Sequence, residues 1–180
     1  MSASVIIAGE EDLIQGYLAP LAADFPGAFG LTDDCAVAAP RPGFEFVLKT
    51  DAVAEDVHFL AGDSPRDIGW KALAVNVSDL AAKGAVPVGY LLSLAFPATP
   101  ERDWMAGFAA GLAEAQTAFG MHLMGGDTDR RPGPLSITPM VIGEAPVGRM
   151  VRRGTAAAGD ALYVSGTLGD AALGLRLRLE

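Results

Sequence analysis

Four aspartates stand where apolar segments end or are interrupted, and they are the side chains of this sequence best suited to chemistry. Asp34, Asp51 and Asp127 end or follow apolar segments, whereas Asp79 interrupts one. Carboxylate oxygens are the ligands that Mg²⁺ prefers, and a bound Mg²⁺ keeps part of its coordination shell for water and phosphates. We therefore expect these carboxylates to converge on a common cation beside a phosphate-containing ligand.

A glycine pair next to one of these aspartates supports the same interpretation. Gly125-Gly126 precedes Asp127 and removes side-chain bulk where a backbone would approach a phosphate. Each aspartate alone also has a simpler explanation, since aspartates in turns commonly accept hydrogen bonds from nearby amides. Asp79 could likewise form an ion pair with Lys83, one helical turn later, and the sequence leaves this alternative open.

The stretch 64–84 is predicted to be the helix that positions Asp79. Ser64 can cap its first turn with Asp67 returning the capping hydrogen bond, and Gly84 can end it. Most positions between these ends are apolar, so we expect the helix to be buried on most sides. A carboxylate in such a helix needs a compensating partner, because desolvation favours its neutral form.

Apolar periodicity predicts the other elements. Helical spacing indicates helices over 10–24 and from Thr99-Pro100 to Gly120, with a last helix after the Gly166–Gly169 turn. Strands are expected at 44–50, 88–96, 121–124, 135–142 and 161–165. The order of elements predicts an α+β fold in which two long helices pack on one face of a mixed β-sheet.

Composition limits the functions that are open to the chain. Its 180 residues predict one domain, or one domain and part of another, and its net charge of −9 disfavours non-specific binding to nucleic acid or anionic membranes. No apolar run approaches the ~20 residues that a membrane helix needs. The N-terminus lacks the basic region of an export signal, so we expect a cytoplasmic protein.

Four strings of the sequence together resemble the thiamine-monophosphate kinase family. They occur in that family's order, and they are Thr32-Asp33-Asp34-Cys35-Ala36-Val37, Thr50-Asp51 with Asp56-Val57-His58-Phe59, Lys71 to Ala82, and Gly125-Gly126-Asp127-Thr128. Similarity continues at Gly148-Arg149, at Arg153 and from Val164 to Ala171, so the resemblance covers nearly the whole chain. The wider superfamily, which includes aminoimidazole ribonucleotide synthetase, is ATP-dependent, and the strings at His58-Phe59 and at 125–128 favour the kinase.

The resemblance implies transfer of the γ-phosphoryl group of ATP to thiamine monophosphate, which gives thiamine diphosphate and ADP. It implies several Mg²⁺ ions and no covalent nucleophile, as suits a reaction that depends on positioning and charge neutralisation. It also implies an aminoimidazole ribonucleotide synthetase-like, ATP- and Mg-binding domain over 1–145. Residues 146–180 would then form a linker and the beginning of a C-terminal α/β domain, and a homodimer would form through the N-terminal sheets.

The resemblance implies a role for each residue that matches a functional position of the family's motifs. The implied Mg²⁺ ligands are Asp34, Thr50, Asp51, Asp79 and Asp127. The implied ATP contacts are Gly126, Asp127 and Arg153, and His58 is the implied contact to thiamine monophosphate. Apart from the resemblance, His58 would be an amphipathic loop residue and Arg153 a solvated charge.

Three residues depart from the family's pattern. Thr32 and Lys49 stand where relatives usually have Gly and Ser, and Lys83 stands where Met is usual. Lys49 brings a cation near the carboxylates, where it would either replace one metal ion or point outward.

Length is a further departure. The family's second domain carries another acidic motif and much of the thiamine pocket, and this chain stops at Glu180, where that domain is expected to begin. Two alternatives remain open at this point. One is another ATP-dependent member of the superfamily, such as an aminoimidazole ribonucleotide synthetase-like enzyme, and the other is a non-catalytic dimerisation module whose aspartates cap turns.

Overall fold

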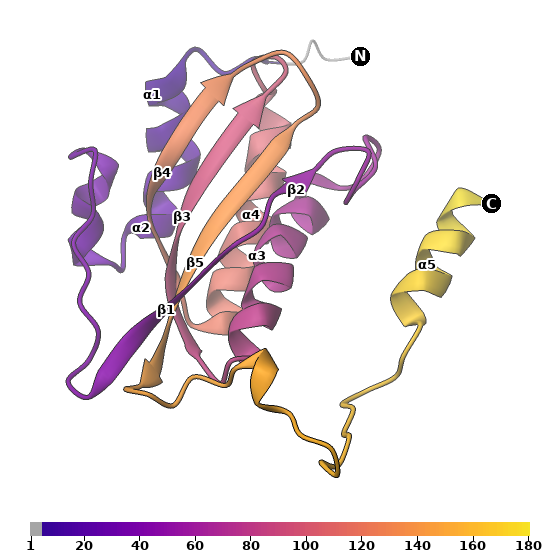
Figure 1. Cartoon of the computed structure of the whole chain (residues 1–180). Helices are drawn as coiled ribbons and strands as arrows, with labels where there is room; N and C mark the ends of the chain where they lie inside the picture. The colour runs from indigo at the N-terminus through magenta and orange to yellow at the C-terminus, as the bar shows by residue number, and fades with distance from the viewer. Residues whose placement is uncertain (1–4) are drawn as a thin grey trace.

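A mixed five-stranded sheet forms the centre of the computed structural model, which describes residues 5–180 (Figure 1). The strands are β1 (Phe44–Thr50), β2 (Val53–Ala54), β3 (Val86–Phe96), β4 (His122–Arg130) and β5 (Ser136–Pro146). Their order is β1-β5-β3-β4, and β2 pairs with β5 just beyond the end of β1. Because β5 is antiparallel to both β1 and β3, while β3 is parallel to β4, the carboxyl ends of β1, β3 and β4 lie at the same edge of the sheet.

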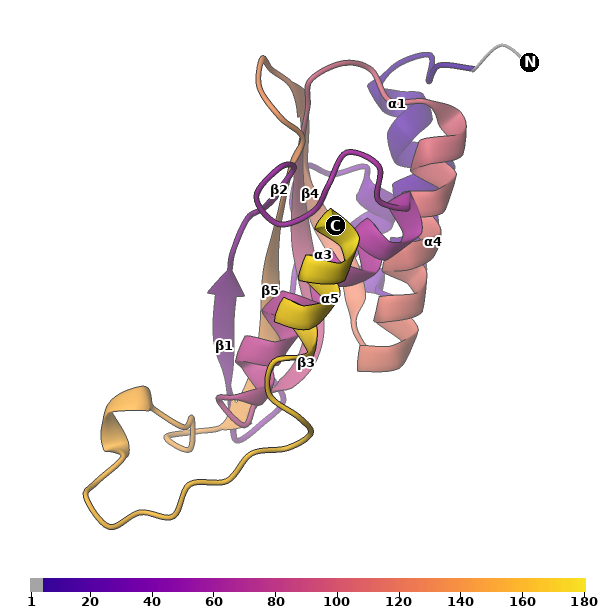
Figure 2. The ribbon, with the colours of Figure 1, turned by 90° about the vertical axis from the view of Figure 1, so that its right-hand side faces the viewer.

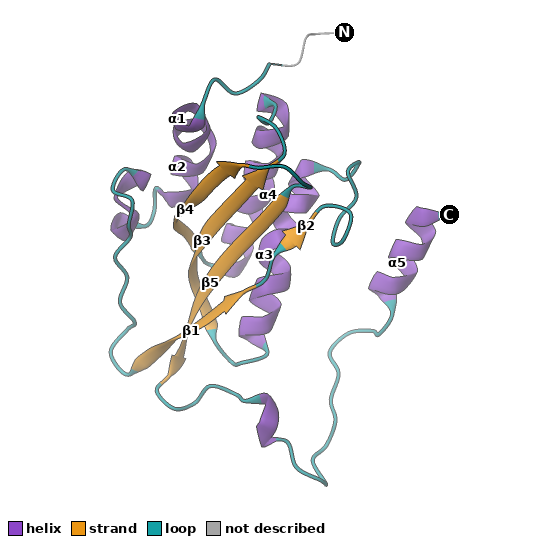
Figure 3. Cartoon of the chain, turned by 45° about the horizontal axis from the view of Figure 1, so that its top comes forward, coloured by secondary structure: helices purple, strands orange, loops and turns teal. Residues whose placement is uncertain are grey.

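Helices cover one face of this sheet and leave the other face without a helical layer (Figures 2 and 3). The two long helices are α3 (Pro65–Ala81) and α4 (Arg102–Phe119), and a helical segment formed by α1 (Glu10–Leu13), η1 (Ile14–Leu18) and α2 (Ala19–Ala22) packs beside α4. The remaining elements are η2 (Pro26–Leu31), η3 (Arg153–Thr155) and α5 (Asp170–Leu179). The predicted α+β architecture is therefore confirmed. Within residues 5–180, no helix combines the length and apolar character needed to cross a membrane.

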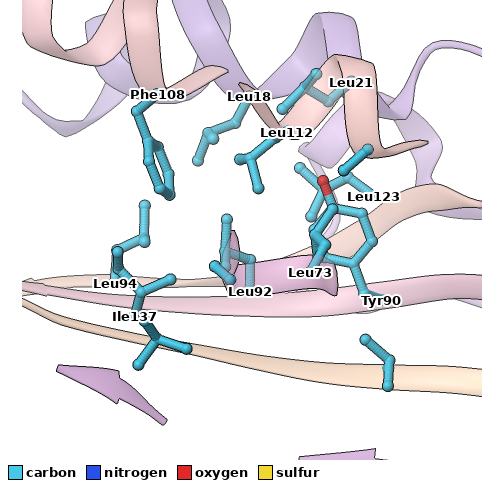
Figure 4. Packing of buried hydrophobic residues seen from close by; sticks show 14 of the residues in the cluster. Leu18, Leu21, Leu73, Tyr90, Leu92, Leu94, Phe108, Leu112, Leu123 and Ile137 are labelled. Atoms are coloured by element: carbon cyan, nitrogen blue, oxygen red, sulfur yellow. The ribbon is translucent and has the colours of Figure 1, made fainter. Parts of the chain in front are cut away.

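The core lies between the helices and the sheet (Figure 4). Tyr90, Leu92 and Leu94 alternate along β3 toward the helices and are fully or almost fully buried. Phe108 and Leu112 of α4 meet them, as the apolar spacing of that helix predicts. Burial of these side chains supplies the main stabilisation that holds α3 and α4 on the sheet.

Glycines set the close spacing of the two long helices. A Cβ atom at Gly111 of α4 would lie 1.9 Å from the carbonyl oxygen of Arg66 in α3, and one at Gly69 of α3 would lie 2.4 Å from the carbonyl oxygen of Phe108. No real Cβ atom tolerates such distances, so only glycine fits at either position. The packing of α3 against α4 thereby fixes the position of the helix that carries Asp79.

Helix α3 differs from its prediction in two respects. The Ser64 side chain makes no capping hydrogen bond, and the backbone carbonyl of Ser64 instead accepts from the Ile68 amide. The helix is also buried along one side only, because the sheet and α4 cover just that side; Trp70 and Val75 remain 38% and 41% exposed. Gly84 follows the helix in a left-handed conformation with φ of +67°, as a helix-ending glycine should.

One predicted strand is much longer in the structure, and another is absent. β4 continues through Gly125–Thr128 to Arg130, because residues 122–130 pair with β3 along their whole length. Residues 161–165, predicted to be a strand, form none among the described residues, since no neighbouring strand pairs with them. The strands predicted at 44–50, 88–96 and 135–142 are confirmed as β1, β3 and β5.

A buried carboxylate attaches the segment before β1 to the sheet. Glu144 of β5 is only 4% exposed, and it accepts hydrogen bonds from the Arg41 backbone amide (2.8 Å) and from Arg41 Nε (2.6 Å). The Arg41 guanidinium also lies 4.2 Å from the centre of the Phe44 ring. Burial acts to raise the pKa of Glu144, but the side-chain and backbone hydrogen bonds from Arg41 outweigh it and hold that pKa below its ordinary value.

This lowered pKa predicts a pH dependence of stability. A carboxylate with a depressed folded pKa stabilises the protein fully above its ordinary value of 4.5, and the contribution is lost as pH falls through the lower folded value. The melting temperature of the wild type should therefore fall more steeply than that of Glu144→Gln below this pH, measured by circular dichroism. The control variant Glu11→Gln, at an exposed position, should follow the wild type. Parallel curves for wild type and Glu144→Gln would contradict the assignment.

Candidate functional site

Lys49 connects two of the candidate carboxylates at the end of β1. Its Nζ lies 2.6 Å from Oδ2 of Asp51 and 2.9 Å from Oδ2 of Asp79 on α3. The Lys49 side chain is 26% exposed, while those of Asp51 and Asp79 are 64% and 50% exposed. Hydrogen bonds to Asp51 and then Asp79 raise the pKa of the Lys49 ammonium, against the smaller opposing effect of burial. Asp79 therefore pairs with a lysine from the sheet, and the alternative pairing with Lys83 is wrong.

Asn76 is the buried polar residue that holds this group together. Its side chain is fully buried in α3, where its Oδ1 accepts from the Asp51 amide at 2.9 Å. Its Nδ2 donates to the carbonyl oxygen of Ala72 at 3.0 Å and, at 3.4 Å, to that of Asp51. A buried amide with these partners carries no unpaired polar atom, which explains its presence in an apolar helix. The sequence marks Asn76 as out of place, but it does not reveal that its partner is the chain just after β1.

The register of the sheet relates the Lys49 group to the glycine pair on β4. Thr50 pairs with Met140, Met140 with Leu91, and Leu91 with Gly125, so these residues form one row across four strands. Three strand spacings put the backbones of Thr50 and Gly125 roughly 14 Å apart. The Thr50 hydroxyl donates to the carbonyl oxygen of Pro139 at 2.9 Å, so it is held by the neighbouring strand.

The other two candidate carboxylates line a cavity beside β4. The cavity has a volume of about 710 Å³, and its walls include Asp34, Asp127 and the glycine pair. This is within the size range of small-molecule sites. Asp34 has a positive φ of 44°, a conformation that is rare for residues other than glycine and that marks a constrained turn at the cavity wall.

Gly126 lines the cavity, and the neighbouring strand β3 leaves no room for a side chain at this position. A Cβ atom at this position would lie 1.9 Å from the carbonyl oxygen of Leu92 in β3. Glycine at this position is therefore required by the backbone of β3, and the expected approach of the glycine pair to a phosphate stays a prediction. Gly125 is less constrained, since a Cβ there would meet only the Leu91 side chain at 3.3 Å.

Asp127 and Lys49 lie on opposite faces of the sheet. Asp127 pairs with Ser93, which alternates along β3 with the buried Leu92 and Leu94 and so belongs to the face without helices. Lys49 instead reaches toward α3 on the helical face. In the part of the chain that the structure describes, no three His, Cys, Asp or Glu side chains lie close enough to hold one metal ion. The four aspartates therefore do not meet at a single cation within one chain.

Asp51 and Asp79 together suit a hard cation. Mg²⁺ is usually held by one or two carboxylates together with phosphates and water. Asp51 and Asp79 direct one oxygen each toward a common point, and the ammonium group at that point shows that the pair accommodates positive charge. The pair Asp51 and Asp79 thus fits a cation, and in this structure the Lys49 ammonium occupies that position.

His58 lies in a tight turn after β2, near the same edge of the sheet. Its Nδ1 accepts from the Ala54 amide at 3.0 Å, so in the neutral imidazole the proton is on Nε2. The Lys71 ammonium of α3 donates to the His58 carbonyl oxygen, and Glu55 accepts from the Leu135 amide at 3.1 Å. The turn is thereby fixed to both α3 and the start of β5, and the exposed imidazole presents an N–H donor.

Arg153 does not join the other candidates within the chain. It lies in η3, which follows the carboxyl end of β5 at Pro146, and Pro146 pairs with Phe44 at the start of β1. This edge of the sheet is opposite to the one at which Thr50 ends β1. Arg153 is exposed and is not part of the cavity wall that contains Asp127, although the resemblance implies that both residues contact ATP.

Comparisons with known proteins identify relatives of the chain. Residues 32–145 match the family model described as AIR synthase related protein, N-terminal domain. A thiamine-monophosphate kinase of Caulobacter vibrioides is 43% identical over 166 residues, which are 92% of this chain and 47% of that protein.

Solved structures of related proteins are similar to this chain as well. The crystal structure of thiamine-monophosphate kinase from Stenotrophomonas maltophilia K279a is similar with a TM-score of 0.75 and 42% identity, covering 83% of this chain and 46% of that one. A structure described as "AaThiL complexed with AMPPCP and TMP" is similar with a TM-score of 0.72 and 35% identity, covering 85% and 52%.

Residues 32–145 contain both carboxylate groups, the His58 turn and most of the cavity wall. The chain spans about half the length of the curated relatives it matches, at 47%, 47% and 45% of three thiamine-monophosphate kinases. The family model alone covers more than half of the chain and runs from just before Asp34 to the end of the sheet. The chain therefore belongs to the AIR synthase related protein family and contains the N-terminal domain of that family.

Proposed function

We propose that this chain is the nucleotide- and Mg²⁺-binding part of a thiamine-monophosphate kinase. The observation that carries the proposal is the likeness, at 35% identity and a TM-score of 0.72, to a structure described as a complex with AMPPCP and TMP. Relatives that are named thiamine-monophosphate kinase and are 41–43% identical support it further. The reaction is transfer of the γ-phosphoryl group of ATP to thiamine monophosphate, and a cytoplasmic location is part of the same proposal.

The proposed roles of the residues follow from the demands of phosphoryl transfer. This reaction depends on positioning and on neutralising phosphate charge rather than on a covalent nucleophile. The Mg²⁺ ions, when bound, would supply positive charge to the phosphate oxygens. The residues proposed to hold them are Asp34, Thr50, Asp51, Asp79 and Asp127.

Two further contacts complete the proposed site. Gly126 keeps the cavity wall beside Asp127 free of a side chain, which suits close contact with ATP. His58 offers its Nε2 proton as a hydrogen-bond donor to the phosphate of thiamine monophosphate. Arg153 is proposed to bind phosphate, and its place at the opposite edge of the sheet means that this contact requires a second subunit or another part of the protein.

We infer a homodimer that forms through the sheet face without helices. Leu48, on that face of β1, is 62% exposed, and its neighbours Phe46 and Met140 are only partly buried. An exposed apolar patch on a sheet is typical of an interaction surface. A dimer through this face would also place the Asp127 side of each sheet against the partner.

The reaction is tested with the complete gene product that contains residues 1–180, supplied with ATP, Mg²⁺ and thiamine monophosphate. We expect thiamine diphosphate, detected by chromatography. Asp51→Ala should reduce turnover by at least about 100-fold, as when one electrostatic stabiliser of the transition state is removed. Its melting temperature should change little, because the Asp51 side chain is 64% exposed. Absence of thiamine diphosphate, with ATP-dependent turnover of a purine precursor, would instead favour an aminoimidazole ribonucleotide synthetase-like enzyme.

Nucleotide binding by the chain itself is tested by calorimetry with AMPPCP in the presence and absence of Mg²⁺. Binding should require Mg²⁺, and Asp79→Asn and Asp127→Asn should each weaken it by about tenfold or more, equivalent to about 1.4 kcal/mol. The control Asp103→Asn, at an exposed position in the first turn of α4, should bind as the wild type does. Unchanged binding in both site variants would favour a non-catalytic dimerisation module.

Dimer formation is tested by sedimentation velocity. The wild type should sediment as a dimer, and Leu48→Asp should shift it to a monomer, because a carboxylate would be buried in the apolar interface. Val75→Asp, at a 41% exposed position on the helical side, is the matched control and should remain dimeric. A monomeric wild type at micromolar concentration would overturn the inferred interface.

A further inference from the structure

The Lys49 ammonium occupies the point toward which two carboxylates are directed. Asp51 follows β1 and Asp79 belongs to α3, yet each has its Oδ2 within 2.9 Å of Lys49 Nζ. Two carboxylates from separate elements that converge on one point form the kind of protein ligand set that binds Mg²⁺ beside a phosphate. Here the cation at that point belongs to the chain itself.

We propose that Lys49 is a built-in cation that replaces one divalent metal ion between Asp51 and Asp79. The inference rests on the proposed function, because it assigns a role within the same phosphate-binding site. It makes Lys49 a positioning residue that holds the two carboxylates together without metal. It also predicts that the site takes up one divalent ion fewer than a site with a neutral residue at position 49.

The fold holds the lysine in this position. Lys49 pairs with the buried Val141 of β5, so its side chain leaves β1 on the helical face, beneath α3. At 26% exposure the ammonium is less hydrated than a free lysine on the surface, and its charge is compensated by the two carboxylates. Asn76 holds the Asp51 backbone through its own hydrogen bonds, which prevents the carboxylate group from moving away with the strand end.

Charge explains why the lysine and a metal ion exclude one another. Asp51 and Asp79 carry two negative charges, and Lys49 neutralises one of them. A divalent ion at the same point would lie within a few ångströms of the ammonium, where like charges repel strongly. Binding there requires displacement of Lys49, whereas a neutral side chain would leave two repelling carboxylates that attract a divalent ion.

The number of bound ions tests the proposal directly. The wild-type chain and Lys49→Met are titrated with Mg²⁺ alone by calorimetry and with Mn²⁺ by electron paramagnetic resonance. We expect Lys49→Met to bind one additional ion per chain, or to bind at least about tenfold more tightly, equivalent to about 1.4 kcal/mol. The control Lys83→Met, a lysine at the end of the same helix that does not contact Asp79, should titrate like the wild type.

Two further variants test whether the additional ion in Lys49→Met binds between Asp51 and Asp79. Lys49→Met combined with Asp79→Asn should lose the additional ion, because one of its ligands is gone. Lys49→Arg should keep the wild-type stoichiometry, since arginine retains the charge. Equal stoichiometry and affinity in wild type and Lys49→Met, or a gain that persists in the double variant, would overturn the proposal.

Thermal unfolding gives a readout that is independent of catalysis. Without divalent ions, Lys49→Met should melt below the wild type, because Asp51 and Asp79 then repel each other. Mg²⁺ should raise its melting temperature toward that of the wild type, which itself should respond less. None of these measurements involves ATP or thiamine monophosphate. Failure of the kinase proposal would therefore appear in the turnover assay. Failure of the proposal for Lys49 would appear in the metal titrations.

Discussion

The buried amide of Asn76 is the interaction on which the candidate site depends. It links a helix to the end of a strand that lies 25 residues earlier in the chain, through hydrogen bonds to both backbone groups of Asp51. An unpaired amide at this depth would be costly, so helix and strand end are held in one arrangement. The position of Asp51 follows from it, and the register of β1 then directs Lys49 toward Asp51 and Asp79.

Local patterns in the sequence predict the elements well, and long-range partners poorly. Alternation at 44–50 predicts β1 at its observed boundaries, and helical spacing predicts the stripe of α4 that packs on the sheet. The partner of Asp79 is not predictable in this way, because helical periodicity offers Lys83 one turn away whereas Lys49 comes from a strand 30 residues earlier. Local spacing carries no information on which strand passes beneath a helix.

The same distinction applies to the glycine pair and to the grouping of the aspartates. Gly126 marks a close backbone contact, as its residue type indicates, but only the register shows that β3 makes the contact. Aspartates at the ends of several apolar segments indicate one shared edge of the sheet. Whether they lie on the same face depends on the alternation of each strand. In β4 this alternation is shifted within the site, because Tyr90 pairs with Leu123 whereas Leu91 pairs with Gly125, so that Met124 is an extra residue.

The contacts between α3 and α4 limit which parts of the domain can change conformation. Positions 69 and 111 place glycine directly against the backbone of the opposing helix, so the two helices cannot slide past each other without a steric clash. The segment from Leu31 to Ala38 lines the cavity, and it is held close to its end. The Val37 amide donates to the Gly27 carbonyl oxygen at 2.8 Å, and a Cβ atom at Gly27 would lie 2.1 Å from the Val37 carbonyl oxygen. The chain is held again at Arg41, which pairs with the buried Glu144. Any adjustment of this cavity wall to a bound molecule would therefore lie before the Gly27–Val37 contact, while α3 and α4 keep their relative position.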